Sequence, residues 1–390
     1  TNAGMGGMIK VILSLQNGII PQTIGIEDAL TSKNKGITED NIVSKKLKWP
    51  QKKLERVAAA SAFGFGGTNA HIIFESTIRK KVNSNSKQKH FPKVSEIPVA
   101  IVGMEAIFGG CNGLNEFYKT IFDKKQHFRK LPNGRFKGFE EHSEVLKNRM
   151  GAWLESFDMD FLRFKLQPDP KERLIPQQLL ALEVTDRAIK KTKLLEGQNV
   201  AVIVAMETEL ELHRFRGRVN LASQIEESLK NSGVFLSDEE QEKLISIAKD
   251  SLLEEVQINK FTSFIGNLMA ARISSLWDFS GPAFTVSSEE NSVYRALDIA
   301  KMYLAEGNIA SVVVTAVDLA GSPENILIRQ RKNPINSSKS TLSFDKDVSG
   351  WMIGEGAGTV VLKNLENSKK DNEQIYAIID AVEFSNKKTA

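Results

Sequence analysis

Apolar runs of strand length alternate along the chain with stretches that have the periodicity of helices. The apolar runs are residues 98–103, 200–204, 283–286 and 311–315. Runs without polar interruption are typical of strands buried on both faces of a sheet. Apolar side chains at helical spacing occur at 114–122 and at about 291–306, and Asn112 is placed to cap the first of these helices. The alternation predicts an α/β layered fold with a covered sheet.

One polar segment, residues 77–96, interrupts this pattern. It is rich in Lys, Ser and Asn and has little to bury, so it predicts a flexible linker. It separates a front piece, 1–76, from a back piece, 97–390. Between Thr77 and Ser95 it carries six basic residues and no acidic one. The net charge of the whole chain is +4, so the rest of the chain has a net charge of −2. The basic character is therefore local, and we expect no nucleic-acid binding.

Both pieces contain further predicted elements. The front piece has an apolar helix pattern at 4–13, a glycine-rich loop at 63–69 and an apparent strand at 71–74. In the back piece, residues 222–258 alternate acids, lysines and leucines, as amphipathic surface helices do.

Composition excludes several classes of protein. Of the 390 residues, 41% are hydrophobic and 26% are charged, as is ordinary for a globular protein, and no apolar run is long enough to span a membrane. The one cysteine, Cys111, cannot form an intramolecular disulfide, and a small buried side chain is its simplest interpretation. A reducing, cytoplasmic location fits this cysteine usage and the absence of a signal-peptide pattern. The chain begins at Thr1 rather than Met, so we expect a fragment.

Residues 280–293 are the most informative stretch for chemistry. A strand enters a tight turn and then a helix, which presents a side chain at a helix N-terminus, where enzymes place activated nucleophiles. Two interpretations remain open: Ser288, Glu289 and Glu290 cap the helix, or they mark a reactive elbow.

Glycine and histidine patterns do not support a nucleotide or metal site. The Gly-x-Gly-x-Gly segment 354–358 lies before a predicted strand, whereas the dinucleotide fingerprint lies between a strand and a helix. The five histidines form none of the spacings of a metal pair, so we expect neither a metal nor a bound cofactor.

The back piece resembles the N-terminal part of a β-ketoacyl synthase (ketosynthase) domain, of the kind found in polyketide and fatty-acid synthases. The motifs that carry the resemblance, in family order, are 97–104, 176–184, 266–274, 281–286, Phe344-Asp345 and 354–358. The resemblance implies a thiolase-like layered αβαβα fold, present here as partial domains. Glu355 matches a family glutamate whose implied role is structural.

The front piece resembles the C-terminal end of the same kind of domain. Lys10 matches the family lysine of the active-site network, and Phe65 matches the phenylalanine that gates the acyl pocket. The signature loop around that gate corresponds to Gly64, Gly66, Gly67, Thr68 and Asn69. A ketosynthase tail followed by a linker and a ketosynthase head predicts the junction of two tandem domains. A circularly permuted single domain is the alternative.

The elbow departs from the family pattern. Aligning Thr285-Val286 and Ala296-Leu297 places Glu290 where ketosynthases carry their nucleophilic cysteine. A carboxylate is a poorer acyl acceptor than a thiolate, and no thioester forms on it. Loss of this cysteine resembles the chain-length-factor domain, which pairs with an active ketosynthase, and the tandem order resembles polyunsaturated fatty acid synthases.

The resemblance implies a multidomain synthase that performs decarboxylative Claisen condensation of acyl and malonyl units. The implied partners are an acyl carrier protein, which bears the phosphopantetheine, and a cysteine-bearing ketosynthase domain in a dimer. This chain alone is then not expected to be catalytic. Two alternatives stay open: Glu290-dependent malonyl decarboxylation, and a non-catalytic scaffold that docks carrier protein through the basic linker.

Overall fold

The structure is a computed structural model that divides the chain into two compact units, residues 1–93 and 94–390. It describes residues 2–23, 34, 36, 38–50, 56–63, 69–76, 97–136, 143–147, 149–166, 174–207, 212–252, 262, 264–319, 323–332, 334–336 and 350–384. The predicted linker 77–96, the loop residues 64–68 and the Phe344-Asp345 motif lie outside these ranges.

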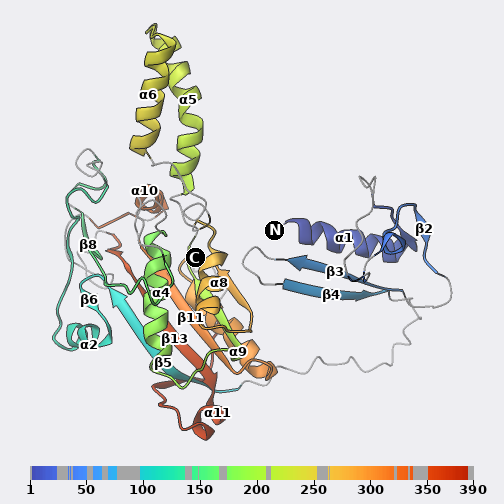
Figure 1. Cartoon of the computed structure of the whole chain (residues 1–390). Coiled ribbons are helices and arrows are strands. Elements are labelled where there is room, and N and C mark those ends of the chain that lie inside the picture. Colours follow the sequence, from blue (N-terminus) through green and yellow to red (C-terminus); the bar gives the residue numbers. More distant parts are fainter. Residues whose placement is uncertain are drawn as a thin grey trace, which may run out of the picture. The chain divides into compact units, whose positions relative to one another are not determined.

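Unit 1 is a helix packed on a β-hairpin (Figure 1). Its elements are α1 (Asn2–Asn17), β1 (Ile19–Ile20), η1 (Glu39–Asn41), β2 (Leu47–Lys48), β3 (Val57–Phe63) and β4 (Asn69–Glu75). Strands β3 and β4 pair antiparallel, with Ala60 opposite Ile72. The helix predicted at 4–13 and the strand predicted at 71–74 are therefore confirmed.

Large apolar side chains of unit 1 remain exposed. Met5, Ile9 and Leu13 follow one another at four-residue spacing along α1, and all three are exposed. On the hairpin, Phe63 is 81% exposed and Ile73 is 68% exposed. Apolar surface on both a helix face and a sheet face is what a complete domain covers with a further layer.

Unit 2 is built around a mixed sheet. Its strands are β5 (Val99–Phe108), β6 (Cys111–Asn112), β7 (Arg129–Lys130), β8 (Met150–Ala152), β9 (Val200–Ala205), β10 (Ala283–Val286), β11 (Ser311–Asp318), β12 (Ile353–Gly354), β13 (Gly356–Asn364) and β14 (Ala377–Ile379). Its helices are α2 (Leu114–Phe122), α4 (Pro176–Ile189), α5 (Leu212–Ser232), α6 (Asp238–Leu252), α8 (Asn267–Leu276), α9 (Ser292–Glu306), α10 (Pro323–Lys332) and α11 (Leu365–Lys370). The main sheet has the order β10-β9-β11-β13-β5-β14.

The sheet is covered on both faces, as the apolar runs predicted. Along β9, Val200, Val202 and Val204 face a core that also contains α4 and α8. The alternate residues Ala201, Ile203 and Ala205 face a second core with α9. Because successive strand residues point to opposite faces, a strand between two helical layers must be apolar throughout.

Three hydroxyl groups contact one another in the first core, the one that contains α4 and α8. Thr185 of α4, Thr315 of β11 and Thr359 of β13 are all buried. Their Oγ1 atoms form a triangle. Thr315 Oγ1 lies 2.6 Å from Thr185 Oγ1 and 2.9 Å from Thr359 Oγ1, and Thr185 Oγ1 lies 3.2 Å from Thr359 Oγ1. These polar side chains satisfy one another inside an apolar layer.

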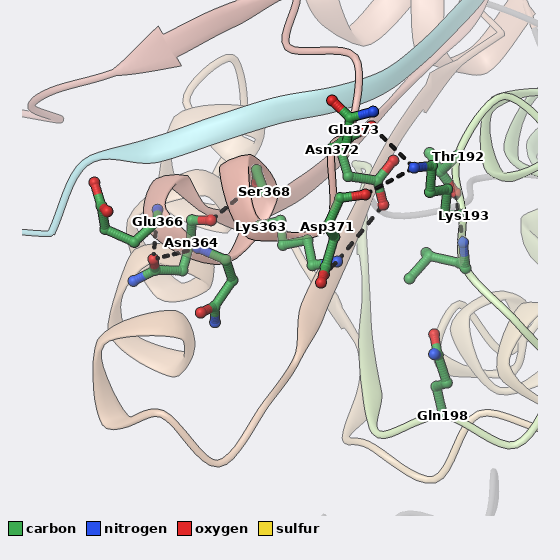
Figure 2. A network of polar contacts seen from close by, with 12 residues as sticks. Thr192, Lys193, Gln198, Lys363, Asn364, Glu366, Ser368, Asp371, Asn372 and Glu373 are labelled. Atoms are coloured by element: carbon green, nitrogen blue, oxygen red, sulfur yellow. Dashed lines mark hydrogen bonds and ion pairs between the residues drawn. The ribbon is translucent and has the colours of Figure 1, made fainter.

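The segment after α4 is tied to the end of α11 by a polar network (Figure 2). Lys193 Nζ donates to the carbonyl oxygens of Asp371 and Asn372 at 2.7 and 2.9 Å. Lys363 pairs with the Asp371 carboxylate. Lysines at a helix C-terminus satisfy carbonyls that have no partner within the helix. The network thereby fixes the turn that leads toward β14.

Two local predictions differ from the structure. Asn112 lies in β6, and the N-cap of α2 is Gly113. The first helical N–H, that of Leu114, donates instead to Glu105 Oε1 of β5 at 2.9 Å. Gly356 and Gly358 lie inside β13 rather than before it.

The amphipathic stretch predicted at 222–258 overlaps a helical hairpin. It consists of α5 and α6, which pack on each other. The part of the stretch after 252 lies outside the described residues. Figure 1 shows the hairpin projecting away from the sheet of unit 2.

Candidate functional site

The predicted elbow is present between β10 and α9. Glu289 has a φ of 50°, in the left-handed region. The N–H of Ser288 donates to Ser292 Oγ at 2.8 Å, and that hydroxyl donates to the carbonyl of Glu289 at 2.6 Å. Ser292 is buried and is the first residue of α9. Its side chain therefore closes the turn and holds the chain in a sharp bend.

Glu290 follows the strained residue and precedes the helix. The N-cap position of α9 is Asn291, so the interpretation in which Ser288, Glu289 or Glu290 is the cap is wrong. Glu290 is exposed and lines a cavity. A carboxylate at this place is favoured by the partial positive charge of the helix N-terminus.

The cavity at the elbow has a volume of about 600 Å³. Its walls are the ends of β9 and β11, the start of β13, and the elbow itself. Strand ends and a helix N-terminus meet here, which is the usual position of a site in an α/β sheet. The volume is within the range of small-molecule sites.

Among the ionisable side chains that line this cavity, the carboxylates outnumber the guanidinium groups. Its carboxylates are Glu207, Glu289, Glu290, Asp318 and Glu355, and its guanidinium is Arg329. Among the described lining residues there is no histidine. The exposed carboxylates of Glu289 and Glu290 disfavour the approach of an anionic substrate to the elbow.

Arg329 joins two of the walls. Its Nη2 donates to Glu207 Oε2 at 2.6 Å and to Asp318 Oδ2 at 3.0 Å. Burial acts to lower the pKa of Arg329, but Asp318 and Glu207 outweigh it and hold that pKa above its ordinary value. The arginine of α10 is thus a fixed positive charge between the segments that follow β9 and β11.

Glu355 is buried at the opposite wall, and its side chain has 0% relative exposure. Arg135 Nη2 donates to its two oxygens at 2.7 and 2.9 Å, and the N–H of Leu154 donates to Oε2 at 2.8 Å. Burial raises the pKa of Glu355, and Arg135 and the Leu154 N–H offset part of this rise. The structural role expected for Glu355 fits these contacts.

The other predicted site residues come from other parts of the sequence. Lys10 is an exposed residue of α1 in unit 1. Phe65 and its neighbours Gly64, Gly66, Gly67 and Thr68 lie outside the described residues, and Asn69 begins β4. Cys111 is buried, with its Sγ 3.3 Å from Thr120 Oγ1, as its simplest interpretation predicted.

Neither a metal cluster nor a membrane helix is found in the part of the chain that the structure describes. Its His, Cys, Asp and Glu side chains form no group of three or more that could hold a metal ion. None of its helices is long and apolar enough to cross a membrane.

Sequence reasoning missed the charged cluster around Arg329. Glu207, Asp318 and Arg329 are separated by more than a hundred positions at the extremes, so no local motif joins them. Their positions in the sequence gave one usable signal, because Glu207 and Asp318 each come at the carboxyl end of a predicted strand. The two strands, β9 and β11, are parallel neighbours, so their carboxyl ends lie side by side.

The sequence matches a known family and several known proteins. A family profile described as "Beta-ketoacyl synthase, N-terminal domain" matches residues 96–368. A polyunsaturated fatty acid synthase polypeptide of Thraustochytrium sp. (strain ATCC 26185 / S-3) is 36% identical, over 97% of this chain and 18% of its own length. Polyketide synthase PksL of Bacillus subtilis (strain 168) is 26% identical, over 74% of this chain and 6% of its own length.

Solved structures of ketosynthases are also similar to this chain. The structure "PfaC Keto synthase-Chain length factor" has a TM-score of 0.85 and 44% identity, and the match covers 97% of this chain and 40% of that one. An oxazolomycin ketosynthase domain from Streptomyces albus JA3453 has a TM-score of 0.54 at 17% identity, over 73% of this chain and 45% of that one, and shares the fold. The chain thus spans less than a fifth of the Thraustochytrium synthase and two fifths of the keto synthase–chain length factor structure.

Proposed function

The chain belongs to the beta-ketoacyl synthase family, and we propose that residues 97–390 form a chain-length-factor-type domain. In this role the domain pairs with a cysteine-bearing ketosynthase and helps to shape the cavity for the growing acyl chain. The partner's cysteine carries the acyl group, and carrier proteins deliver acyl and malonyl units for decarboxylative Claisen condensation. The similarity to a polyunsaturated fatty acid synthase and to a keto synthase–chain length factor supports this assignment.

The observation that carries the proposal is Glu290 at the elbow. The backbone bend, the helix N-terminus and the cavity are those of a site for a nucleophile, but the side chain at this position is a carboxylate. Glu290 cannot accept an acyl group as a thioester. Glu289 beside it adds a second exposed carboxylate, which would also repel a malonyl unit. A scaffold role fits this chemistry better than catalysis does.

Unit 1 fits the end of an upstream ketosynthase domain. On this proposal residues 1–76 belong to that domain and residues 77–96 connect it to the next one. The exposed apolar faces of α1 and of the β3–β4 hairpin then belong to the layered core of the upstream domain. Lys10 and the loop with Phe65 would serve the upstream active site.

The test uses the full synthase that contains this chain. Glu290→Ala and the matched control Glu289→Ala are each compared with the unmodified protein, while carbon dioxide release from malonyl-carrier protein and product chain length are followed. We expect Glu290→Ala to keep the rate of release within about twofold, which is less than about 0.5 kcal/mol in barrier height. A loss of about a hundredfold or more at Glu290 alone would favour the decarboxylase alternative, because a general base contributes roughly that much.

The scaffold alternative has its own measurement. If the basic segment 77–96 recruits acidic carrier protein, replacing its six basic residues by glutamine should weaken carrier binding and its salt dependence. Binding that is unchanged by these replacements would dismiss the linker as a docking element.

A further inference from the structure

The turn that joins α5 and α6 is a stiff, exposed tip. At its start, Gly233 has a φ of 66°, and its N–H and that of Val234 donate to carbonyls of the last turn of α5. At its end, Ser237 caps α6: its hydroxyl donates to Glu240 Oε2 at 2.8 Å and accepts from the N–H of Glu240 at 3.3 Å. Caps on both sides hold the turn in one conformation.

The side chains at this tip combine an aromatic ring with negative charge. Phe235 is 94% exposed, and Val234 beside it is 47% exposed. Residues 226–242 include six acidic side chains and one basic side chain. We call residues 226–242 the acidic tip. Presenting a phenyl ring from a capped turn costs little further ordering when a partner binds.

Helix α2 presents a surface of the opposite charge. Tyr118, Ile121 and Phe122 are each more than half exposed, and the rings of Tyr118 and Phe122 lie 4.4 Å apart. Residues 114–130 carry five lysine and arginine side chains against two acidic ones. We call residues 114–130 the aromatic-basic patch. An apolar cluster of this kind rimmed by charge marks an interaction surface.

We propose that the acidic tip of one copy of this chain binds the aromatic-basic patch of a second copy. Phe235 would pack on Tyr118 and Phe122, while the acids of the tip face the lysines around them. In Figure 1 the hairpin projects from the sheet while α2 lies at the other end of the same unit. The two surfaces therefore meet only between copies. The inference is independent of the function proposed above.

The charge of the tip selects against other occupants. An acidic surface repels carrier proteins when they are acidic, and it also repels nucleic acids and anionic membranes. A single tip-on-patch contact between two copies leaves the tip of one copy and the patch of the other free. These two free surfaces can bind each other, which closes a two-fold pair, or bind further copies, which extends a series.

We expect the interface between the tip and the patch to be weak. One turn of a hairpin on one helix buries less than the roughly 1,000 Å² that a stable interface needs. Its strength would therefore rest on the phenyl anchor and on charges that are screened at distances beyond about 10 Å in roughly 0.1 M salt. Where several such contacts join the same copies, their combined strength exceeds that of one contact.

The test is sedimentation of the full chain over a range of concentrations at low and high salt. We expect a mean mass that rises with concentration at low salt and falls back at high salt. Phe235→Asp, or the pair Lys124→Glu and Lys125→Glu, should abolish the rise, whereas Leu162→Asp, at a side chain 90% exposed elsewhere on the unit, should not. The lysine pair is surface exposed, so its reversal tests the patch without disturbing the core.

Mixing the variants tests the heterologous geometry. The Phe235→Asp protein keeps an intact patch, and the lysine-reversed protein keeps an intact tip. An equimolar mixture should form one contact per pair and stop there, at twice the mass of each variant alone. The proposal is overturned if Phe235→Asp behaves like Leu162→Asp, if the unmodified chain does not associate beyond its behaviour at high salt, or if the mixture shows no complementation.

Discussion

Arg135 and Glu355 form a two-pronged ion pair between positions 220 residues apart in the sequence. One guanidinium nitrogen lies 2.7 and 2.9 Å from the two carboxylate oxygens. The backbone of Glu355 extends the connection: its N–H donates to the carbonyl of Ala152, and its carbonyl accepts from the N–H of Gly109. The wall of the elbow cavity therefore depends on one buried carboxylate and its partner.

Arg135→Leu should be strongly destabilising. It leaves the Glu355 carboxylate buried without its counter-charge, and breaking a buried pair from one side costs about 3–5 kcal/mol. Urea denaturation followed by circular dichroism measures the free energy of unfolding. Lys369→Met is the control, because it removes an exposed pair with Glu366 that is worth under about 1 kcal/mol. Equal losses in the two variants would contradict the role given to Arg135.

Glu105 and Glu355 should give the stability opposite dependences on pH. Burial acts to raise the pKa of Glu105, but Lys191 and the N–H groups of Ala106 and Leu114 outweigh it and hold the pKa below its ordinary 4.5. The unfolded chain then binds the proton first as the pH falls. The stability that Glu105 supplies is present above pH 4.5 and is lost as the pH falls through its lower folded value.

The folded-state pKa of Glu355 is raised, so the sign reverses. The folded protein binds the proton first, and stability declines as the pH rises through 4.5 toward the folded value. Glu105→Gln should therefore flatten the acid limb of a plot of unfolding free energy against pH. Glu355→Gln should remove the decline of the unfolding free energy that the unmodified protein shows just above pH 4.5. Parallel curves for the two variants would contradict these assignments.

Thr315→Val should cost about 1–3 kcal/mol of unfolding free energy, since the hydroxyls of Thr185 and Thr359 lose a partner in an apolar layer. Thr315→Ser keeps the hydroxyl and serves as the matched control. Replacing all three threonines by valine removes every hydroxyl that needs a partner, so it should cost less than three times the single change. Chemical denaturation of the three variants provides the comparison. A Thr315→Ser variant as unstable as Thr315→Val would show that packing, not hydrogen bonding, dominates.

Glu289→Val should lower stability by about 1–2 kcal/mol, because a β-branched residue fits the left-handed region poorly. Glu289→Asn should be tolerated, since Asn enters that region most readily after Gly. Both variants remove the same carboxylate, so the difference between them does not arise from the loss of that charge. Thermal unfolding of both variants is the measurement. Identical midpoints would mean that the elbow relaxes to another conformation.

Much of the sheet could be predicted, because its pattern is local. The apolar runs at 200–204 and 311–315 became β9 and β11, and the run at 283–286 became β10. Each of these strands is apolar because it lies between two helical layers, and this requirement is visible in the residues themselves.

The cap of α2 could not be predicted, because its partner is distant. Asn112 has the right chemistry, but its segment pairs with β5, and Glu105 supplies the acceptor for the helix N-terminus. Asn112 uses its own side-chain oxygen to accept a hydrogen bond from Arg187 at 2.9 Å. Tertiary contacts therefore replaced a local preference.

The elbow was predicted from sequence, whereas its charged surroundings were not. The order strand, turn, helix is written in consecutive residues and predicted the elbow, and the resemblance to ketosynthases then singled out Glu290 within it. Arg329 reaches Glu207 and Asp318 only after the sheet and α10 have assembled. Side chains that come together only in the tertiary fold have no characteristic spacing in the sequence, so no local motif predicts their contact.

The three threonines of the first core have a consequence for proton order. A hydroxyl donates one hydrogen bond, so a triangle of hydroxyls is satisfied when each donates to the next in the same rotational sense. The opposite sense satisfies the triangle equally well. The core of unit 2 thus holds two nearly equivalent arrangements of hydrogens on one fixed set of heavy atoms, and this buried polar group keeps a degree of freedom that the surrounding packing does not remove.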